Sequence, residues 1–380
     1  MGESVGKIKV FGVWLKTWHL YLIVPLLGLL LVGCAAGLLV VGGALMSGSS
    51  GINSTSSGSS GLKSITGQVF SQGSENSIAP VGNAKVTAYW GETRSISIQR
   101  GVIKASGGKQ KETYTNSDGS YTLDDIDTGV TVDITIEKED YTANTQEVDT
   151  SVANPEAKGI INQKNKNKKT IFKDTDTDIN TAEDTNDKGE KLPECHISVP
   201  AGAVDSDMEA ELTPYFSINT LPVALPDGYI GLAGADFFTS SPITFTTGKE
   251  AKPYIVLPKS VRAEELSNTN IKLMELIEVN GELRWVIVKD DAGTGDAKCK
   301  YHSTGLYNGL LGPDDDQPAN KQAKLKRGRP FCYVYPVPQI ATITGTIKNT
   351  SGQPIQNVMV FGGGSATTTD AQGRYTLAKV

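Results

Sequence analysis

The sequence predicts an all-β protein of tandem β-sandwich domains, placed behind an N-terminal membrane helix or signal peptide. After the N-terminal region, apolar residues alternate with polar ones in short runs rich in β-branched side chains, as in Ile65–Val69, Ala84–Tyr89 and Val130–Ile136. This alternation is typical of strands with one buried face. Asn280-Gly281 separates two such runs, and this pair is a strong hairpin signal. Several short strands at this spacing favour antiparallel sandwiches.

The range 1–46 carries the features of a membrane anchor. Residues 20–46 contain no Asp, Glu, Lys or Arg; lysines precede them, and a Gly/Ser-rich stretch follows. The apolar run is longer than the roughly 20 residues that a helix needs to cross a bilayer. Lysines on its N-terminal side favour a cytoplasmic start of the chain. We therefore expect a membrane-anchored, extracytoplasmic protein, exposed at the cell surface or on the periplasmic side.

Cys34 gives this anchor two interpretations. Leu31-Val32-Gly33-Cys34 resembles the lipobox of bacterial lipoproteins, in which the cysteine takes the lipid. The apolar stretch before it has the length of a signal-peptide core, so cleavage would make a lipidated Cys34 the first residue. The alternative is an uncleaved transmembrane helix, because residues 35–46 remain apolar, as a spanning segment requires. The sequence leaves both interpretations open.

Composition divides the rest of the chain into domains and linkers. Two charged stretches carry few large apolar side chains, so they cannot bury enough apolar surface to offset the entropy of ordering. The last range is too short for a complete sandwich and should not be stable alone, so we expect the natural chain to continue. The expected ranges are a Gly/Ser linker at 47–62, a first sandwich at 63–150, a charged linker at 151–192, a second β-sandwich domain at 193–312, a charged linker at 313–338 and an incomplete repeat at 339–380.

The two ends of the extracytoplasmic part share a sequence repeat. Ile65-Thr66-Gly67 matches Ile343-Thr344-Gly345, and residues 118–123 match residues 372–377 around a common Gly-x-Tyr-Thr-Leu. This order of motifs resembles the carboxypeptidase regulatory-like domain. The resemblance implies a transthyretin-like (prealbumin-like) sandwich for the first domain, with an insertion at 91–113, and the first half of the same fold at the C-terminus.

A second resemblance covers the middle of the chain, residues 195–312. Ile197–Val204 is similar to the opening strand and turn of the β-sandwich domain shared by ankyrins, netrin receptors and zonula occludens proteins. Trp285 and His302-Ser303 follow in that family's order. The resemblance implies that the segment around His302 closes a sheet and is structural.

Motifs for catalysis are missing from this sequence. It contains no nucleophile elbow, no His-Glu-x-x-His and no phosphate-binding glycine loop, so we expect a protein that is not an enzyme and has no cofactor. Asp174, Asp176 and Asp178 alternate as in a calcium loop, but Ile179 stands where that loop needs glycine. Calcium at these aspartates is therefore the alternative to a solvated acidic linker.

Cysteines and histidines allow one further metal hypothesis. Cys195-His196, Cys299, His302 and Cys332 include the residue types that bind zinc, but the paired Cys-x-x-Cys spacing is absent. The alternative is a set of structural strand histidines with one disulfide. Proximity in sequence favours Cys299–Cys332 as that disulfide.

Three aromatic residues flank the insertion and are candidate ligand-binding residues. Aromatic side chains on sandwich loops commonly stack on sugars, and Tyr89, Trp90 and Tyr114 stand in such places; core positions are the alternative. A net charge of -6 gives no reason to expect a nucleic-acid partner. The sequence therefore suggests a non-catalytic adhesion module that binds a glycan or a surface protein. The alternatives are an accessory region of a larger secreted peptidase or glycan-active enzyme, and a structural stalk.

Overall fold

Strands make up nearly all of the regular structure in the computed structural model, which confirms the all-β fold class. Most of residues 61–343 belong to one compact unit, and residues 344–360 and 367–376 belong to another. No helix in the described residues is long and apolar enough to cross a bilayer; the apolar run 20–46, with Cys34, lies outside them. The structure describes residues 7–10, 13–16, 61–74, 77–92, 95–99, 102–257, 270–337, 342–362 and 365–377, which begin with the paired strands β1 (Lys7–Val10) and β2 (Val13–Lys16).

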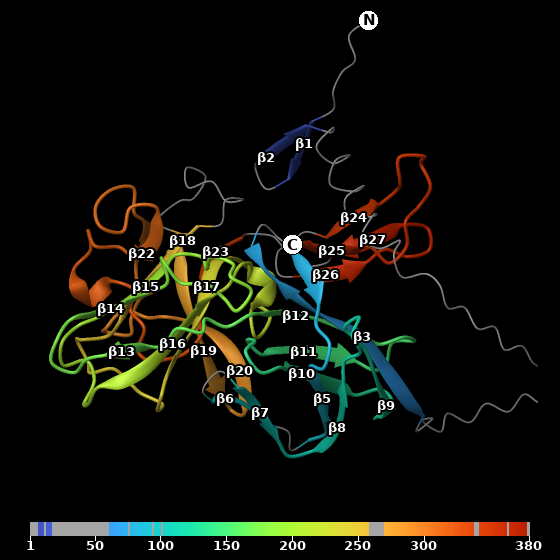
Figure 1. Ribbon diagram of the computed structural model, residues 1–380, viewed down its shortest axis with the longest axis horizontal. Coiled ribbons are helices and arrows are strands. Elements are labelled where there is room, and N and C mark those ends of the chain that lie inside the picture. Colours follow the sequence, from blue (N-terminus) through green and yellow to red (C-terminus); the bar gives the residue numbers. More distant parts are fainter. Residues whose placement is uncertain are drawn as a thin grey trace, which may run out of the picture. The chain divides into compact units, whose positions relative to one another are not determined.

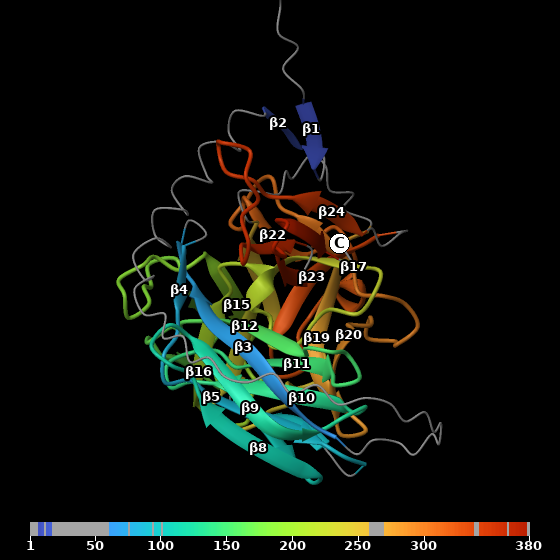
Figure 2. The ribbon, with the colours of Figure 1, turned by 90° about the vertical axis from the view of Figure 1, so that its right-hand side faces the viewer.

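The first sandwich consists of two sheets that face each other across one apolar core (Figures 1 and 2). Alternate residues of each strand point inward, as the sequence pattern predicts: in β5, Val86, Ala88 and Trp90 are buried. One sheet has the order β11 (Asn144–Asp149), β10 (Thr131–Glu137), β5 (Lys85–Trp90) and β8 (Lys109–Tyr114). The other joins β12 (Glu156–Asn162), β3 (Leu62–Gln72) and β4 (Ile78–Pro80), with β9 (Ser120–Asp127) also paired to β3.

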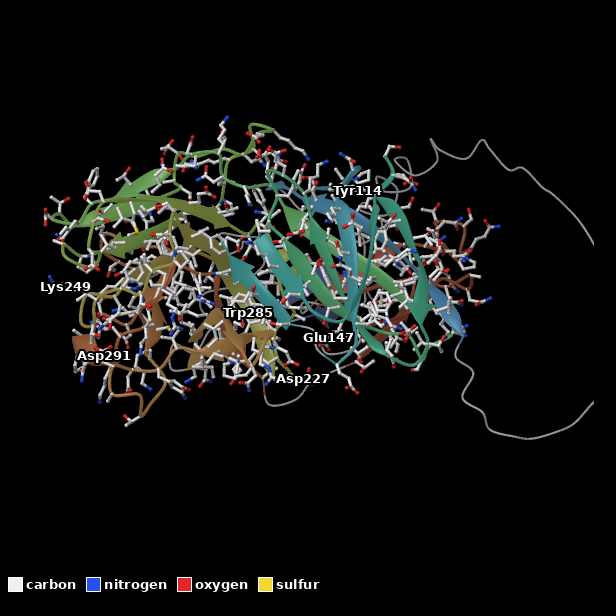
Figure 3. All side chains as sticks on the ribbon, turned by 90° about the horizontal axis from the view of Figure 1, so that it is seen from below. Tyr114, Glu147, Asp227, Lys249, Trp285 and Asp291 are labelled. Atoms are coloured by element: carbon white, nitrogen blue, oxygen red, sulfur yellow. The ribbon has the colours of Figure 1, made fainter. Side chains whose placement is uncertain are left out.

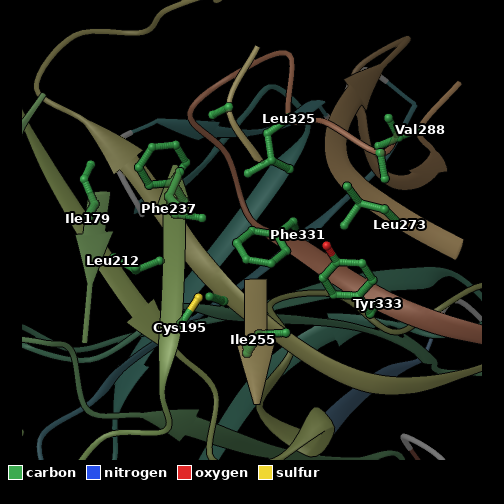
Figure 4. Close-up of a cluster of buried hydrophobic side chains, with 14 of the residues drawn as sticks. Ile179, Cys195, Leu212, Phe237, Ile255, Leu273, Val288, Leu325, Phe331 and Tyr333 are labelled. Carbon is green, nitrogen blue, oxygen red and sulfur yellow. The ribbon is translucent and has the colours of Figure 1, made fainter. Parts of the chain in front are cut away.

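The second sandwich is larger, with a six-stranded and a five-stranded sheet. Its core contains Phe237 and Phe331 from one sheet and Ile255 from the other (Figure 4). The Tyr333 hydroxyl donates to the Pro253 carbonyl at 2.7 Å and joins the two sheets. The larger sheet has the order β13 (Lys169–Ile171), β16 (Met208–Pro214), β17 (Tyr229–Thr239), β23 (Phe331–Pro336), β19 (Lys272–Val279) and β20 (Glu282–Ile287). The smaller has the order β14 (Thr177–Asn180), β15 (Cys195–Val199), β18 (Lys252–Val256), β22 (Leu310–Pro313) and β21 (Cys299–Tyr301).

Both ranges expected as charged linkers are folded, which corrects that expectation. The range 151–192 contains β12, which pairs in parallel with β3, together with β13 and β14. The range 313–338 contains the 3₁₀ turn η6 (Ala319–Lys321) and β23, which lies between β17 and β19. Charged residues obscure short apolar strands in both ranges, and polar side chains supply part of the ordering through buried hydrogen bonds. Asn165 and Asp184, for example, are 6% and 5% exposed.

The insertion at 91–113 joins the two sandwiches. It contains the hairpin β6 (Ser95–Gln99) and β7 (Val102–Ser106) and ends with β8. Ile96 and Ile103 from this hairpin share an apolar cluster with Met274 and Trp285 of the second sandwich. The Ile96 backbone N–H also donates to the Gly281 carbonyl at 2.6 Å. The two sandwiches therefore share a buried apolar interface.

The C-terminal unit repeats one packing feature of the first sandwich. A Cβ added to Gly345 would lie 2.6 Å from the Tyr375 hydroxyl oxygen, and one added to Gly67 would lie 2.5 Å from that of Tyr121. The two glycine–tyrosine pairs of the sequence repeat therefore pack in the same way. The strands of this range are β24 (Ile343–Thr346), which pairs with β27 (Arg374–Leu377), and β25 (Met359–Gly362) and β26 (Ser365–Thr368).

Candidate functional site

The structure places the three aromatic candidates in different environments. Trp90 is only 4% exposed, and its indole Nε1 donates to Asp127 Oδ2 at 2.8 Å. Its ring lies in the core of the first sandwich and cannot stack on a ligand, so we remove it from the candidate ligand-binding residues. Tyr114 is 54% exposed and lies at the surface (Figure 3).

Tyr89 and Tyr114 share the outer face of the β5–β8 pair but lie apart. Tyr89 pairs with Gln110, and Tyr114 pairs with Lys85. Four residues therefore separate the two tyrosines along the strands, which at 3.3–3.4 Å per residue is roughly 13 Å. The two rings do not form one stacking surface.

The three aspartates of the calcium hypothesis do not converge on one site. Asp176 Oδ1 accepts a hydrogen bond from the Ala201 backbone N–H at 2.8 Å, and Asp178 Oδ2 lies 2.9 Å from His196 Nδ1. Asp174 is exposed. Within the described ranges, no group of three or more His, Cys, Asp or Glu side chains is arranged to hold a metal ion.

The cysteines give neither the expected disulfide nor a zinc site. Cys195, Cys299 and Cys332 are free and buried, which corrects the expectation of a Cys299–Cys332 bridge. Cys299 lies in β21 and Cys332 in β23, strands of opposite sheets. Burial raises the pKa of all three thiols, so they remain neutral and behave as small apolar core residues.

A cluster of histidines and tyrosines lies on the outer side of the five-stranded sheet. We call His196, Tyr254, His302 and Tyr307 the histidine–tyrosine cluster. The rings of Tyr254 and Tyr307 stack with centroids 3.5 Å apart and planes 14° apart. His196 meets Tyr307 edge-on at 5.6 Å, and His302 meets Tyr254 edge-on at 5.5 Å.

Strand alternation and register bring these residues together. Cys195 and Ile197 point into the core, so His196, between them, faces outward. His196 and Tyr254 are direct partners in the β15–β18 register. A Cβ added to Gly312 on β22 would lie 2.3 Å from Tyr254 Cδ1 and 2.9 Å from His302 Nε2. Only glycine leaves room for both rings.

Carboxylates hold His196 from both sides. Its Nδ1 lies 2.9 Å from Asp178 Oδ2, and its Nε2 lies 3.0 Å from Glu194 Oε1. Partial burial lowers the pKa of His196, but the hydrogen bonds to Asp178 and Glu194 outweigh this and raise the pKa above its ordinary value. The imidazolium form is therefore favoured at this position.

His302 lies in a different electrostatic environment. It is 7% exposed, and its Nε2 lies 3.0 Å from the Pro313 carbonyl oxygen. Burial lowers the pKa of His302, and the negative charge of Asp315, whose Oδ2 lies 3.8 Å from Nδ1, opposes that shift only in part. The cluster therefore holds one imidazole that favours the charged form and one that favours the neutral form.

The exposed side of the cluster combines an aromatic surface with acidic groups. Tyr307 is partly exposed, and the side chains of Asp178, Glu194 and Asp315 are 43%, 48% and 41% exposed. Sequence reasoning treated His196 and His302 as possible zinc ligands or as structural strand residues, and it missed the pairing of Tyr254 with Tyr307. Tyr254 lies in a strand that the sequence predicts, but Tyr307 lies in a turn before β22. Their stack is a long-range contact that no local sequence pattern indicates.

Comparisons with known proteins do not assign this chain to a protein family. No family model matches the chain, and no curated protein is significantly similar to it.

Proposed function

We propose that this chain is a non-catalytic binding module that holds a glycan at the histidine–tyrosine cluster. The observation that carries the proposal is the stacked pair Tyr254–Tyr307, beside His196, whose pKa is raised by its hydrogen bonds to Asp178 and Glu194. Tyr254 is buried and fixes Tyr307 from below, while Tyr307 is partly exposed. A ring held in this way contributes contact area at a low cost in conformational entropy.

The groups around the rings match the chemistry of a sugar. One face of a pyranose is apolar and packs on an aromatic ring, and its hydroxyl groups donate to carboxylate oxygens. Asp178, Glu194 and Asp315 supply such acceptors at the edge of the cluster. His196, as an imidazolium, offers N–H donors to Asp178 and Glu194 and so keeps these two acceptors in place.

The test is a glycan array probed with the purified chain 1–380 and two variants. We expect wild-type binding to at least one glycan class, and a loss of about fivefold or more with Tyr307→Ala, because a flat ligand ring stacked on an aromatic side chain, such as a base, contributes about 1–3 kcal/mol. Tyr114→Ala is the matched control, since Tyr114 is the more exposed tyrosine on the other sandwich. Equal binding by the Tyr307→Ala variant, or loss with Tyr114→Ala alone, would contradict the proposal.

We further propose that the module is held at a membrane by a lipid on Cys34, after cleavage of the residues that precede it. The lysine-flanked apolar run and the Leu31-Val32-Gly33-Cys34 motif support this. Mass spectrometry of the N-terminus, isolated from membranes, tests it. A diacylated N-terminal Cys34, and an uncleaved Cys34→Ala variant, are expected. Intact peptides from residues 1–16 in both proteins would instead indicate a transmembrane helix.

A further inference from the structure

Lys324 is a buried lysine that faces two carboxyl groups in the second sandwich. Its side chain is 8% exposed, and its Nζ lies 2.9 Å from Asp291 Oδ2 and 3.5 Å from Glu250 Oε2. The Glu250 side chain is 6% exposed, and in the described part of the chain its Oε2 atom makes no hydrogen bond. A buried carboxylate oxygen at this distance from an amine, with no hydrogen-bond donor, calls for an explanation.

The backbone fixes the three residues independently of their side chains. Ala251 and Leu325, which follow Glu250 and Lys324, exchange backbone hydrogen bonds of 3.2 and 2.8 Å. The Asp291 backbone N–H donates to the Asn320 carbonyl at 2.9 Å. Leu325 packs in the main apolar core (Figure 4). Asp291 lies at the same end of this sandwich as Lys249, the neighbour of Glu250 (Figure 3).

We propose that Lys324 and Asp291 condense to form an intramolecular isopeptide bond, with Glu250 as the proton carrier. A proton passes from the Lys324 ammonium to the Asp291 carboxylate, and the neutral Nζ then attacks Cγ of Asp291. Glu250 takes a second proton from Nζ and delivers it to the departing oxygen. The N–C bond forms, a C–O bond breaks, and one water molecule leaves, so the reaction needs no other reactant.

Burial favours this outcome over a lasting ion pair. The Lys324 charge is buried, and a buried charge recovers little net free energy from attraction to a partner; a neutral amide removes its desolvation cost. The Asp291 side chain is 27% exposed, which leaves the water a path to solvent. The bond would close a loop between Asp291 and Lys324 and restrict the unfolded chain, as a disulfide does.

The test is peptide mapping of the purified chain 1–380 by tandem mass spectrometry. We expect one branched peptide joining the segments of Asp291 and Lys324, lighter by one water than the two separate peptides. Separate, unmodified peptides in the wild type would overturn the proposal and leave a buried ion pair. The Lys169–Asp184 pair, at 3.1 Å, is an internal control. Its lysine side chain is 32% exposed and its carboxylate also accepts hydrogen bonds from Asn165 and Asn167, so its peptides should remain separate.

Three variants test the roles of the residues. Lys324→Arg keeps the charge but has no nucleophilic amine, and Asp291→Ala has no carboxyl group, so both should give only separate peptides. Glu250→Gln keeps the size of the side chain and should lose at least nine-tenths of the branched peptide. A branched peptide at the wild-type level in Glu250→Gln would contradict the role of Glu250. Resistance to limited proteolysis shows that each variant is folded.

Discussion

The side-chain amide of Asn165 donates a hydrogen bond to Asp184 Oδ2 at 2.8 Å, inside a stretch whose composition is that of a linker. Asn167 Nδ2 donates to Asp184 Oδ1 at 2.7 Å, and Lys169 Nζ lies 3.1 Å from the same oxygen. Asn165 also donates to the Leu212 carbonyl at 3.1 Å, which attaches this network to β16. Asp184 is therefore the centre of a polar network that orders the chain between the two sandwiches.

Replacing Asp184 should destabilise the larger unit. Asp184→Asn keeps the shape but loses the charge that accepts three hydrogen bonds, and removing a buried partner costs roughly 1–3 kcal/mol. The denaturant midpoint of the chain 1–380 measures this loss. Asp187→Asn is the matched control, because Asp187 is an exposed residue of the same loop. Equal midpoints for the two variants would show that the network contributes nothing.

The same carboxyl group predicts a pH dependence. Burial raises the pKa of Asp184, but hydrogen bonds from Asn165, Asn167 and Lys169 outweigh it and hold the pKa below its ordinary value. A carboxyl group whose pKa is lower in the folded state contributes stability above its unfolded pKa, and this is lost as the pH falls through the folded pKa. The stability difference between wild type and Asp184→Asn should therefore shrink below about pH 4. A difference that stays constant down to about pH 3 would contradict this.

The sequence predicts the strands well where order depends on local patterns. Asn280 and Gly281 have φ angles of 54° and 82°, and Val279 pairs with Glu282 across them, so the predicted hairpin is confirmed. The folded state of 151–192 could not be predicted in this way, because its order rests on partners distant in sequence, as between Asn165 and Leu212. The Tyr254–Tyr307 stack is a long-range contact of the same kind.

The hairpin β6–β7 should couple the unfolding of the two sandwiches. Ile103 is 3% exposed and lies in the cluster shared with the second sandwich, whereas its neighbour Val102 is 42% exposed. Ile103→Ala should cost about 2–5 kcal/mol, as for other buried isoleucines, and Val102→Ala should change little. We expect the wild-type unit to unfold in one calorimetric transition and an Ile103→Asp variant to show two. Two transitions in the wild type would mean that this interface does not couple the sandwiches.

Gly312, which packs against the histidine–tyrosine cluster, should not tolerate a larger side chain. A Cβ there would lie 2.3 Å from the Tyr254 ring, so Gly312→Ala must displace the stacked tyrosines or strand β22. Overpacking of this kind costs about 1–3 kcal/mol. Thermal unfolding measures it, with Ser303→Ala as the control, since Ser303 is exposed nearby. A Gly312→Ala variant as stable as the control would show that the cluster is loosely packed.

The two imidazoles of the cluster should titrate on opposite sides of the ordinary histidine value. Burial lowers the pKa of His302, and Asp178 and Glu194 raise that of His196 despite its partial burial. An NMR titration of the histidine ring protons, assigned with His196→Gln, measures both. Asp178→Asn should lower the pKa of His196, while Asp174→Asn, which alters a nearby exposed carboxylate, should leave it unchanged.

Because the folded pKa of His196 is raised, its contribution to stability is complete below the unfolded pKa and is lost as the pH rises through the folded pKa. The proposed glycan site uses the Asp178 and Glu194 carboxylates, which the His196 imidazolium holds in place, so glycan binding should weaken over the same pH interval. Glycan binding that is independent of pH there would show that His196 does not organise the site.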